Sequence, residues 1–124
     1  MSYFVDTNIN NFLSNPFEKR KSIAERIIRD YDGYIPIIIG RAELKNTPTI
    51  RKYKYVASRE MTFGNFIVEI KKNIDNIDAN TNIFVFFPDN RLVPISDKIS
   101  YLYDKYKNKD GFLYLFYSIE NTFG

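Results

Sequence analysis

The chain has 124 residues, of which 44% are hydrophobic and 27% are charged, and its formal net charge is +3. These values are typical of one soluble globular domain. The sequence contains no Cys and no His, which excludes disulfides, thiolate nucleophiles and thiolate zinc sites and removes the commonest general base. We therefore expect a cytoplasmic binding protein without catalytic residues, metal site or cofactor, rather than an enzyme.

The first clear helix start is N-P-F-E, with Asn15 as N-cap, Pro16 at the first helical position and Glu18 placed to complete a capping box. Residues 1–14 form an N-terminal extension that could include a short helix. The helix ends at Asp32-Gly33. Ile23 lies off its apolar stripe, which consists of Ala24, Ile27, Ile28 and Tyr31.

Two strands follow this helix. The β-branched run Y-I-P-I-I-I-G-R-A-E (34–43) is apolar at consecutive positions, as expected of a central strand. The segment 47–58 alternates instead, with Lys52, Lys54 and Val56 on one side and two tyrosines on the other. The short connection between the two runs predicts a hairpin.

Thr62 opens the helix with the strongest apolar stripe, and N-I-F-V-F-F (82–87) is typical of a buried strand, followed by a short R-L-V-P-I strand. Ser96 is the predicted cap of a further helix, which Gly111 ends. The last strand is F-L-Y-L-F-Y-S (112–118). The stripes of these two helices are Phe63, Phe66, Ile67, Ile70 and Ile74, and Ile99, Leu102, Tyr103 and Tyr106.

The predicted order is β-β-α-β-(β)-α-β after one or two helices, which indicates an α+β fold. A hairpin, a packing helix and a last strand that returns to the sheet form a grasp around a helix. We therefore expect a ubiquitin-like β-grasp over residues 15–118, with one or two additional N-terminal helices.

Four segments together resemble the autophagy ubiquitin-like modifiers of the GABARAP type: N-P-F-E-K-R-K-S, Y-I-P-I-I-I, K-Y-K-Y-V-A-S-R-E-M-T-F-G-N-F and the end L-Y-D-K-Y-K-N-K-D-G-F-L-Y-L-F-Y-S-I-E-N-T-F-G. The resemblance covers about residues 15–124. It implies attachment of the carboxylate of Gly124, at the end of a flexible tail of residues 119–124, to the amine of phosphatidylethanolamine. Glycine suits this role because its carbonyl is unhindered by a Cβ.

The resemblance also implies partners and a location. Activating and conjugating enzymes with catalytic cysteines would carry the chain as a thioester, and a cysteine protease would process or deconjugate it. The conjugated form would lie on autophagosomal or related membranes, and the free form in the cytoplasm. On the membrane it would recruit cargo receptors that carry an aromatic-x-x-aliphatic motif.

Such motifs add as a strand to a sheet edge and place two side chains in two pockets. The resemblance puts the edge at about Arg51–Ser58, with Lys52 beside the aromatic pocket and facing acidic residues of the partner. The second, aliphatic pocket would consist of Tyr55, Ala57, Met61 and Phe66. The aromatic pocket would be lined by Ile23, Ile27, Pro36, Lys54, Val56 and Phe112.

This chain departs from the family pattern at the second pocket. Glu69 replaces an aliphatic residue and Ser58 replaces a proline. An acid at the wall would weaken an aliphatic anchor or favour a partner with a nearby cation, but Glu69 could equally point to solvent. Phe84 and Phe86 resemble a further partner site of the family, although core packing explains them better.

Two other functions stay open, and a third is not expected. A ubiquitin-like modifier of the same kind could be conjugated to a protein lysine, and an unconjugated adaptor could use the peptide groove alone. A nucleic-acid module is not expected, because a net charge of +3 is modest for a phosphate binder and no nucleic-acid signature occurs.

Overall fold

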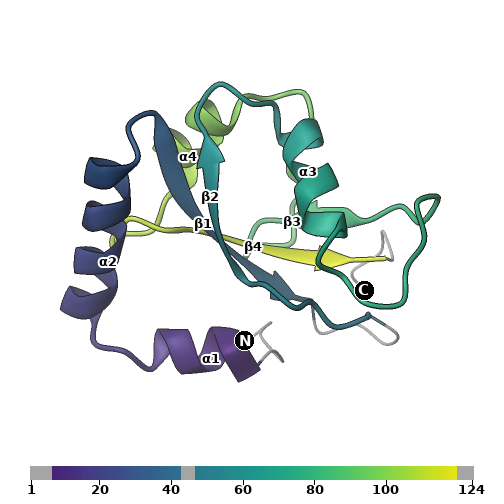
Figure 1. Cartoon of the computed structure of the whole chain (residues 1–124), viewed down its shortest axis with the longest axis horizontal. Helices are drawn as coiled ribbons and strands as arrows, with labels where there is room; N and C mark the ends of the chain where they lie inside the picture. Colours follow the sequence, from purple (N-terminus) through teal and green to yellow (C-terminus); the bar gives the residue numbers. More distant parts are fainter. Residues whose placement is uncertain (1–6, 43–46, 120–124) are drawn as a thin grey trace.

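The computed structural model describes residues 7–42 and 47–119, which form one mixed four-stranded sheet in the order β2-β1-β4-β3 (Figure 1). β1 pairs antiparallel with β2 and parallel with β4, while β3 pairs antiparallel with β4. The sheet confirms the predicted ubiquitin-like β-grasp. The strands are β1 Tyr34–Arg41, β2 Lys54–Ser58, β3 Phe84–Phe86 and β4 Leu113–Ser118.

Both additional N-terminal helices are present, and the four helices divide between the two faces of the sheet. α1 (Thr7–Leu13) and α2 (Phe17–Asp30) pack on one face, and α3 (Phe63–Lys71) and α4 (Ile99–Tyr106) on the other. Successive residues of β1 and β4 point to opposite faces, so each strand contributes to both clusters. The small cluster, on the α1–α2 face, consists of the buried residues Ile9, Phe12, Ala24, Ile38, Phe112 and Tyr114.

The large cluster, on the α3–α4 face, forms the main core. Thr62 caps α3 as predicted, because its side-chain oxygen accepts a hydrogen bond from the Asn65 backbone N–H at 3.3 Å. The predicted stripes of α3 and α4 both point into this cluster. Its buried members include Ile37, Tyr55, Phe63, Phe66, Ile70, Ile99, Leu102, Leu115 and Tyr117.

The predicted cap of α2 is wrong, and its predicted stripe is half right: Ala24 and Ile27 face the small cluster, whereas Ile28 and Tyr31 are exposed. Pro16 is the N-cap, and the Nδ2 group of Asn15 donates to the Phe12 carbonyl oxygen at 3.0 Å instead of capping. Ile28 is 43% exposed, whereas Ile23 is partly buried against the small cluster. The sheet-facing side is the stripe Arg20, Ile23, Ala24 and Ile27, whose first position is a charged residue and therefore escapes an apolar pattern.

Other element edges differ from the prediction because local pairing replaces regular structure. α4 begins at Ile99 rather than after Ser96, because Lys98 is extended and forms a bridge with Thr62. β2 is confined to Lys54–Ser58, and the 91–95 segment makes only an isolated bridge between Leu92 and Phe86. Phe86 is 2% exposed and Phe84 is partly buried, as core packing predicts for Phe86.

None of the helices within residues 7–42 and 47–119 is long and apolar enough to cross a bilayer. The longest, α2, has 14 residues.

Candidate functional site

β2 lies at an edge of the sheet, where it pairs with β1 and with no other strand of the described residues. Its side chains alternate, with Lys54 and Val56 exposed and Tyr55 and Ala57 buried. An edge strand presents unpaired backbone groups that can accept an added strand. The edge predicted from the sequence is therefore present, although it is shorter than the predicted range.

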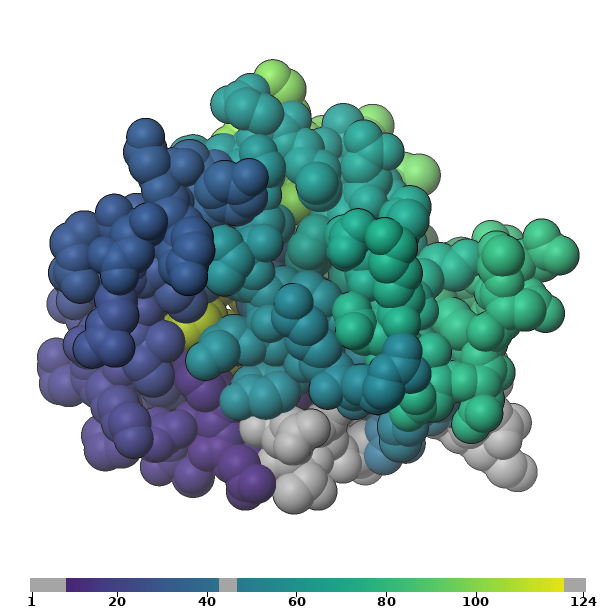
Figure 2. Space-filling model, in the orientation of Figure 1, coloured from purple at the N-terminus to yellow at the C-terminus, as the bar shows by residue number. Residues whose placement is uncertain are grey.

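One side of this edge brings together the residues predicted for the aromatic pocket, here called the first subsite. Pro36 and Val56 are register partners, so their side chains lie on the same face of the sheet, and Lys54 pairs with Ile38 on that face. Ile23 and Ile27 of α2 pack against the small cluster beside them. Figure 2 shows a hollow between α2 and β2 with atoms of the β4 region, in yellow, at its floor.

Phe112 lies beneath this subsite and not at its surface, because it is fully buried. Its ring packs edge-on against Phe12 of α1, with the ring centroids 5.0 Å apart. Phe12 and Ile9 of α1 also belong to the small cluster, and neither was predicted from the sequence. The spacing of Ile9, Phe12 and Leu13 is that of one helix face, and this was the available signal.

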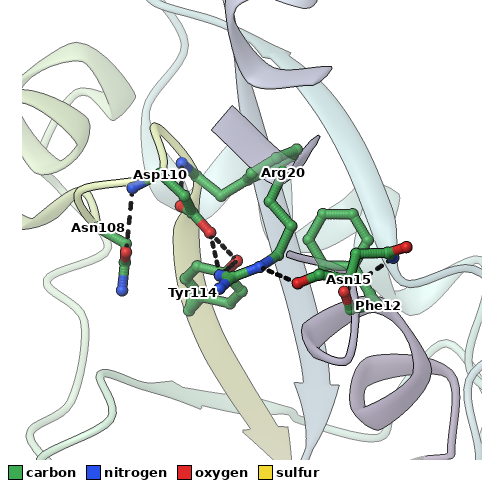
Figure 3. Close-up of polar contacts among 7 residues, drawn as sticks. Phe12, Asn15, Arg20, Asn108, Asp110 and Tyr114 are labelled. Atoms are coloured by element: carbon green, nitrogen blue, oxygen red, sulfur yellow. Dashed lines mark hydrogen bonds and ion pairs between the residues drawn. The ribbon is translucent and has the colours of Figure 1, made fainter. Parts of the chain in front are cut away.

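A buried polar network holds α2 against β4 (Figure 3). Arg20 Nη1 donates to Asp110 Oδ2 at 2.7 Å, and its Nε donates to the Asn15 carbonyl oxygen at 3.1 Å. The Tyr114 hydroxyl donates to the same Asp110 oxygen, and the other oxygen of Asp110 accepts the Phe112 backbone N–H at 2.9 Å. Burial, and then the bond to Asp110, raises the pKa of Tyr114.

This network positions the first subsite, because it fixes the first turn of α2 and the start of β4 relative to each other. Asp110 is fully buried, and a buried carboxylate is stable only when it is paired and hydrogen-bonded. Arg20 and Asp110 both belong to the segments that resemble the family, but no feature of the sequence predicted that they pair. They lie 90 positions apart and are brought together only by the fold.

On the other side of β2 is a pocket of about 160 Å³, the second subsite. The four predicted residues line it, and so does Glu69, whose carboxylate also pairs with Lys72 at 3.0 Å. Lys52 Nζ lies 4.9 Å from the centre of the Tyr55 ring. Lys52 therefore borders the second subsite, whereas the family resemblance suggested a place beside the first.

The proposed attachment residue, Gly124, lies outside the described residues. β4 ends at Ser118, and the last residue that the structure describes is Ile119. The structure therefore places the groove residues but not the conjugation residue.

Comparisons with known proteins agree on one family. The model of the family described as "Autophagy protein Atg8 ubiquitin like" matches residues 19–124. An autophagy-related protein 8-like protein of Dictyostelium discoideum is 46% identical over 109 residues, covering 86% of each chain. Autophagy-related protein 8e of Arabidopsis thaliana is 44% identical over 112 residues, covering 90% of each chain.

Solved structures give the same result. Trypanosoma brucei ATG8 superposes with a TM-score of 0.80 at 31% identity, covering 90% of this chain and 95% of that one. Plasmodium falciparum Atg8, solved in complex with a P. falciparum Atg3 peptide, has a TM-score of 0.74 at 30% identity, covering 86% and 92%.

Proposed function

The chain belongs to the Atg8 family of autophagy ubiquitin-like proteins, and on this premise we propose that it is a modifier conjugated through Gly124 to phosphatidylethanolamine. The observation that carries the proposal is the family match, which continues through Gly124. In the conjugate, the Gly124 carbonyl carbon is bonded to the lipid amine in an amide. A protein of this kind is a substrate of enzymes and not itself an enzyme.

The partners follow from this chemistry. An activating enzyme adenylates the carboxylate, and the chain then passes between cysteine thiols of the activating and conjugating enzymes as a thioester. A cysteine protease processes or releases it. The Atg3 peptide bound to the P. falciparum relative supports a conjugating enzyme among these partners. The lipid-bound form lies on autophagosomal or related membranes.

The second part of the proposal is that the β2 edge recruits partners with an aromatic-x-x-aliphatic motif. The open edge supports this, because the motif can pair with β2 while its aromatic side chain enters the first subsite. Lys54 and Val56 form the exposed rim of that subsite. Two anchors contribute about 1.5–3 kcal/mol each, and ordering the peptide opposes part of this gain. We expect dissociation constants on the order of micromolar for a single motif.

Reconstitution tests the conjugation. The chain is incubated with cognate activating and conjugating enzymes, ATP and vesicles containing phosphatidylethanolamine, and its intact mass is measured. We expect an increase equal to one lipid minus one water. Vesicles of phosphatidylcholine, which has no primary amine, and the Gly124→Ala variant serve as controls. An unchanged mass would contradict lipid conjugation and favour the unconjugated adaptor. Attachment to a protein lysine would instead identify the protein-conjugated modifier.

Titration calorimetry with an aromatic-x-x-aliphatic peptide tests the groove separately. Lys54→Glu places an acid at the rim of the first subsite and should reduce affinity at least tenfold, whereas Lys109→Glu, an exposed position outside the groove, makes the same charge change as a control. If both variants and the natural chain bind the peptide with equal affinity, the motif does not bind at the β2 edge.

A further inference from the structure

Exposed apolar side chains gather where β2 ends, beside both subsites. Nine large hydrophobic side chains are exposed among the described residues, and four of them, here called the end patch, are Ile28, Tyr31, Tyr34 and Val56. Tyr34 links the four: its backbone N–H donates to the Tyr31 carbonyl oxygen at 3.0 Å, and it lines one pocket with Ile28 and the second subsite with Val56. Contiguous exposed apolar patches often mark interaction sites.

The two subsites are offset along β2, which gives the direction of a bound motif. On the sheet, the first subsite is bounded by the register partners Pro36 and Val56. The second subsite extends two residues further along β2, to the partners Tyr34 and Ser58. A motif whose aliphatic anchor follows its aromatic anchor therefore runs in the same direction as β2.

Strand alternation then places one further side chain of the motif on the end patch. Alternate residues of an added strand point to the same face and lie about 6.6 Å apart. The second x, two residues after the aromatic anchor, therefore points to the α1–α2 face just past the first subsite. Val56 and Tyr34 are exposed at this place, and the end of α2 contributes Ile28 and Tyr31 beside them.

The charges around the end patch give an acidic residue no advantage there. Asp32 lines the adjacent pocket of about 320 Å³. Both cations of that pocket have neighbours of their own, since Arg59 pairs with Asp104 at 2.9 Å and Lys107 Nζ lies 5.2 Å from the centre of the Tyr103 ring. An apolar side chain needs no ionic partner and is stabilised by burial against the patch.

We propose that the end patch selects a large apolar residue, such as isoleucine or phenylalanine, as the second x of a bound aromatic-x-x-aliphatic motif. This inference rests on the proposed peptide groove and keeps both of its anchors. The apolar side chain covers the Tyr34 ring and Val56 and removes their surface from water. Glutamate at this position meets Asp32, and serine leaves the patch exposed.

Three synthetic peptides test the selection on the full chain. They share an aromatic first anchor, an alanine as the first x and a leucine second anchor, and differ only at the second x, which is Ile, Ser or Glu. In titration calorimetry we expect the Ile peptide to bind about fivefold more tightly than either of the others, because part of one apolar side chain is buried.

Two substitutions of Tyr34 test whether the patch causes this preference. Tyr34→Arg replaces the ring with a cation, so the Ile-to-Glu ratio of affinities should fall to about one or reverse. Tyr34→Ser removes apolar surface without adding charge, so the Ile-to-Ser ratio should fall by at least about half. Tyr34 is 45% exposed, and Tyr101→Arg, at a 52% exposed tyrosine of α4, makes the same change as a control and should keep both ratios.

The outcomes separate this inference from the groove itself. Equal or tighter binding of the Ser or Glu peptide to the natural chain overturns the inference and leaves the groove intact, and so do ratios that stay unchanged in both Tyr34 variants. Failure of all three peptides to bind overturns the groove and the inference together.

Discussion

The two faces of the sheet are stabilised in different ways. Among the described residues, the large cluster on the α3–α4 face contains twenty buried hydrophobic residues, whereas the small cluster on the α1–α2 face contains six. The small face adds the buried network of Arg20, Asp110 and Tyr114. Apolar burial is non-directional, so it holds α3 and α4 without fixing fine orientation. Directional bonds hold α2, and α2 supplies Ile23 and Ile27 to the first subsite.

The largest effect is expected from breaking the network at its centre. Asp110→Ala leaves the Arg20 guanidinium and the Tyr114 hydroxyl without their acceptor, and removing one partner of a buried pair costs about 3–5 kcal/mol. We expect the free energy of unfolding, measured by urea titration, to fall by this amount. Asp104→Ala removes an acid from the exposed pair with Arg59 and should change it by roughly 0.5 kcal/mol or less. Equal effects of the two variants would show that the network does not hold α2.

A smaller and local effect is expected at α1. Ile9→Ala removes a fully buried side chain from the small cluster and should cost roughly 2–3 kcal/mol, at the low end for such truncations. α1 has only seven residues, so the loss should appear mainly as local opening. Hydrogen exchange should accelerate in α1 and leave the amides of β1 and β4 protected. Uniform acceleration across the sheet would instead show that both faces unfold as one unit.

The same contrast explains what the sequence could predict. The large face follows from periodicity: the stripe of Phe63, Phe66 and Ile70 gave α3 and its core direction correctly. On the small face the stripe of α2 begins with Arg20, which an apolar pattern excludes. Ile28 was therefore wrongly predicted to face the sheet. The buried role of Asp110 depends on pairing over 90 positions of sequence and leaves no local signal.

The candidate groove shows the same limit. Alternation along β2 predicted which side chains face outward, and family resemblance predicted the residues of both subsites. Neither predicted that Phe112 is wholly buried and packs against Phe12, or that the Tyr55 hydroxyl is buried. Both facts depend on tertiary packing between elements and not on the order of residues within one.

Alkaline pH should act on Tyr55 of the large face. Its pKa is about 12 in the folded chain, against an ordinary value of 10, because burial disfavours the charged form. The folded state therefore holds the Tyr55 proton more tightly than the unfolded state does. The stabilisation of the folded state that results is complete below pH 10 and is lost as the pH rises toward 12. Tyr55→Phe should lose roughly 1–2 kcal/mol less stability than the natural chain over this window. Identical pH profiles by denaturant titration would contradict the burial of the hydroxyl.

The smallest effect compares two helix starts on the large face. Thr62 accepts a hydrogen bond from the Asn65 backbone N–H, so Thr62→Ala should lower the free energy of unfolding by about 1 kcal/mol. Ser96 was the predicted cap of α4, but that helix begins at Ile99 after the extended Lys98. Ser96→Ala should therefore change stability by about 0.5 kcal/mol or less. If Ser96→Ala lowers the free energy of unfolding as much as Thr62→Ala, the Ser96 hydroxyl, and not the bridge between Thr62 and Lys98, determines where α4 begins.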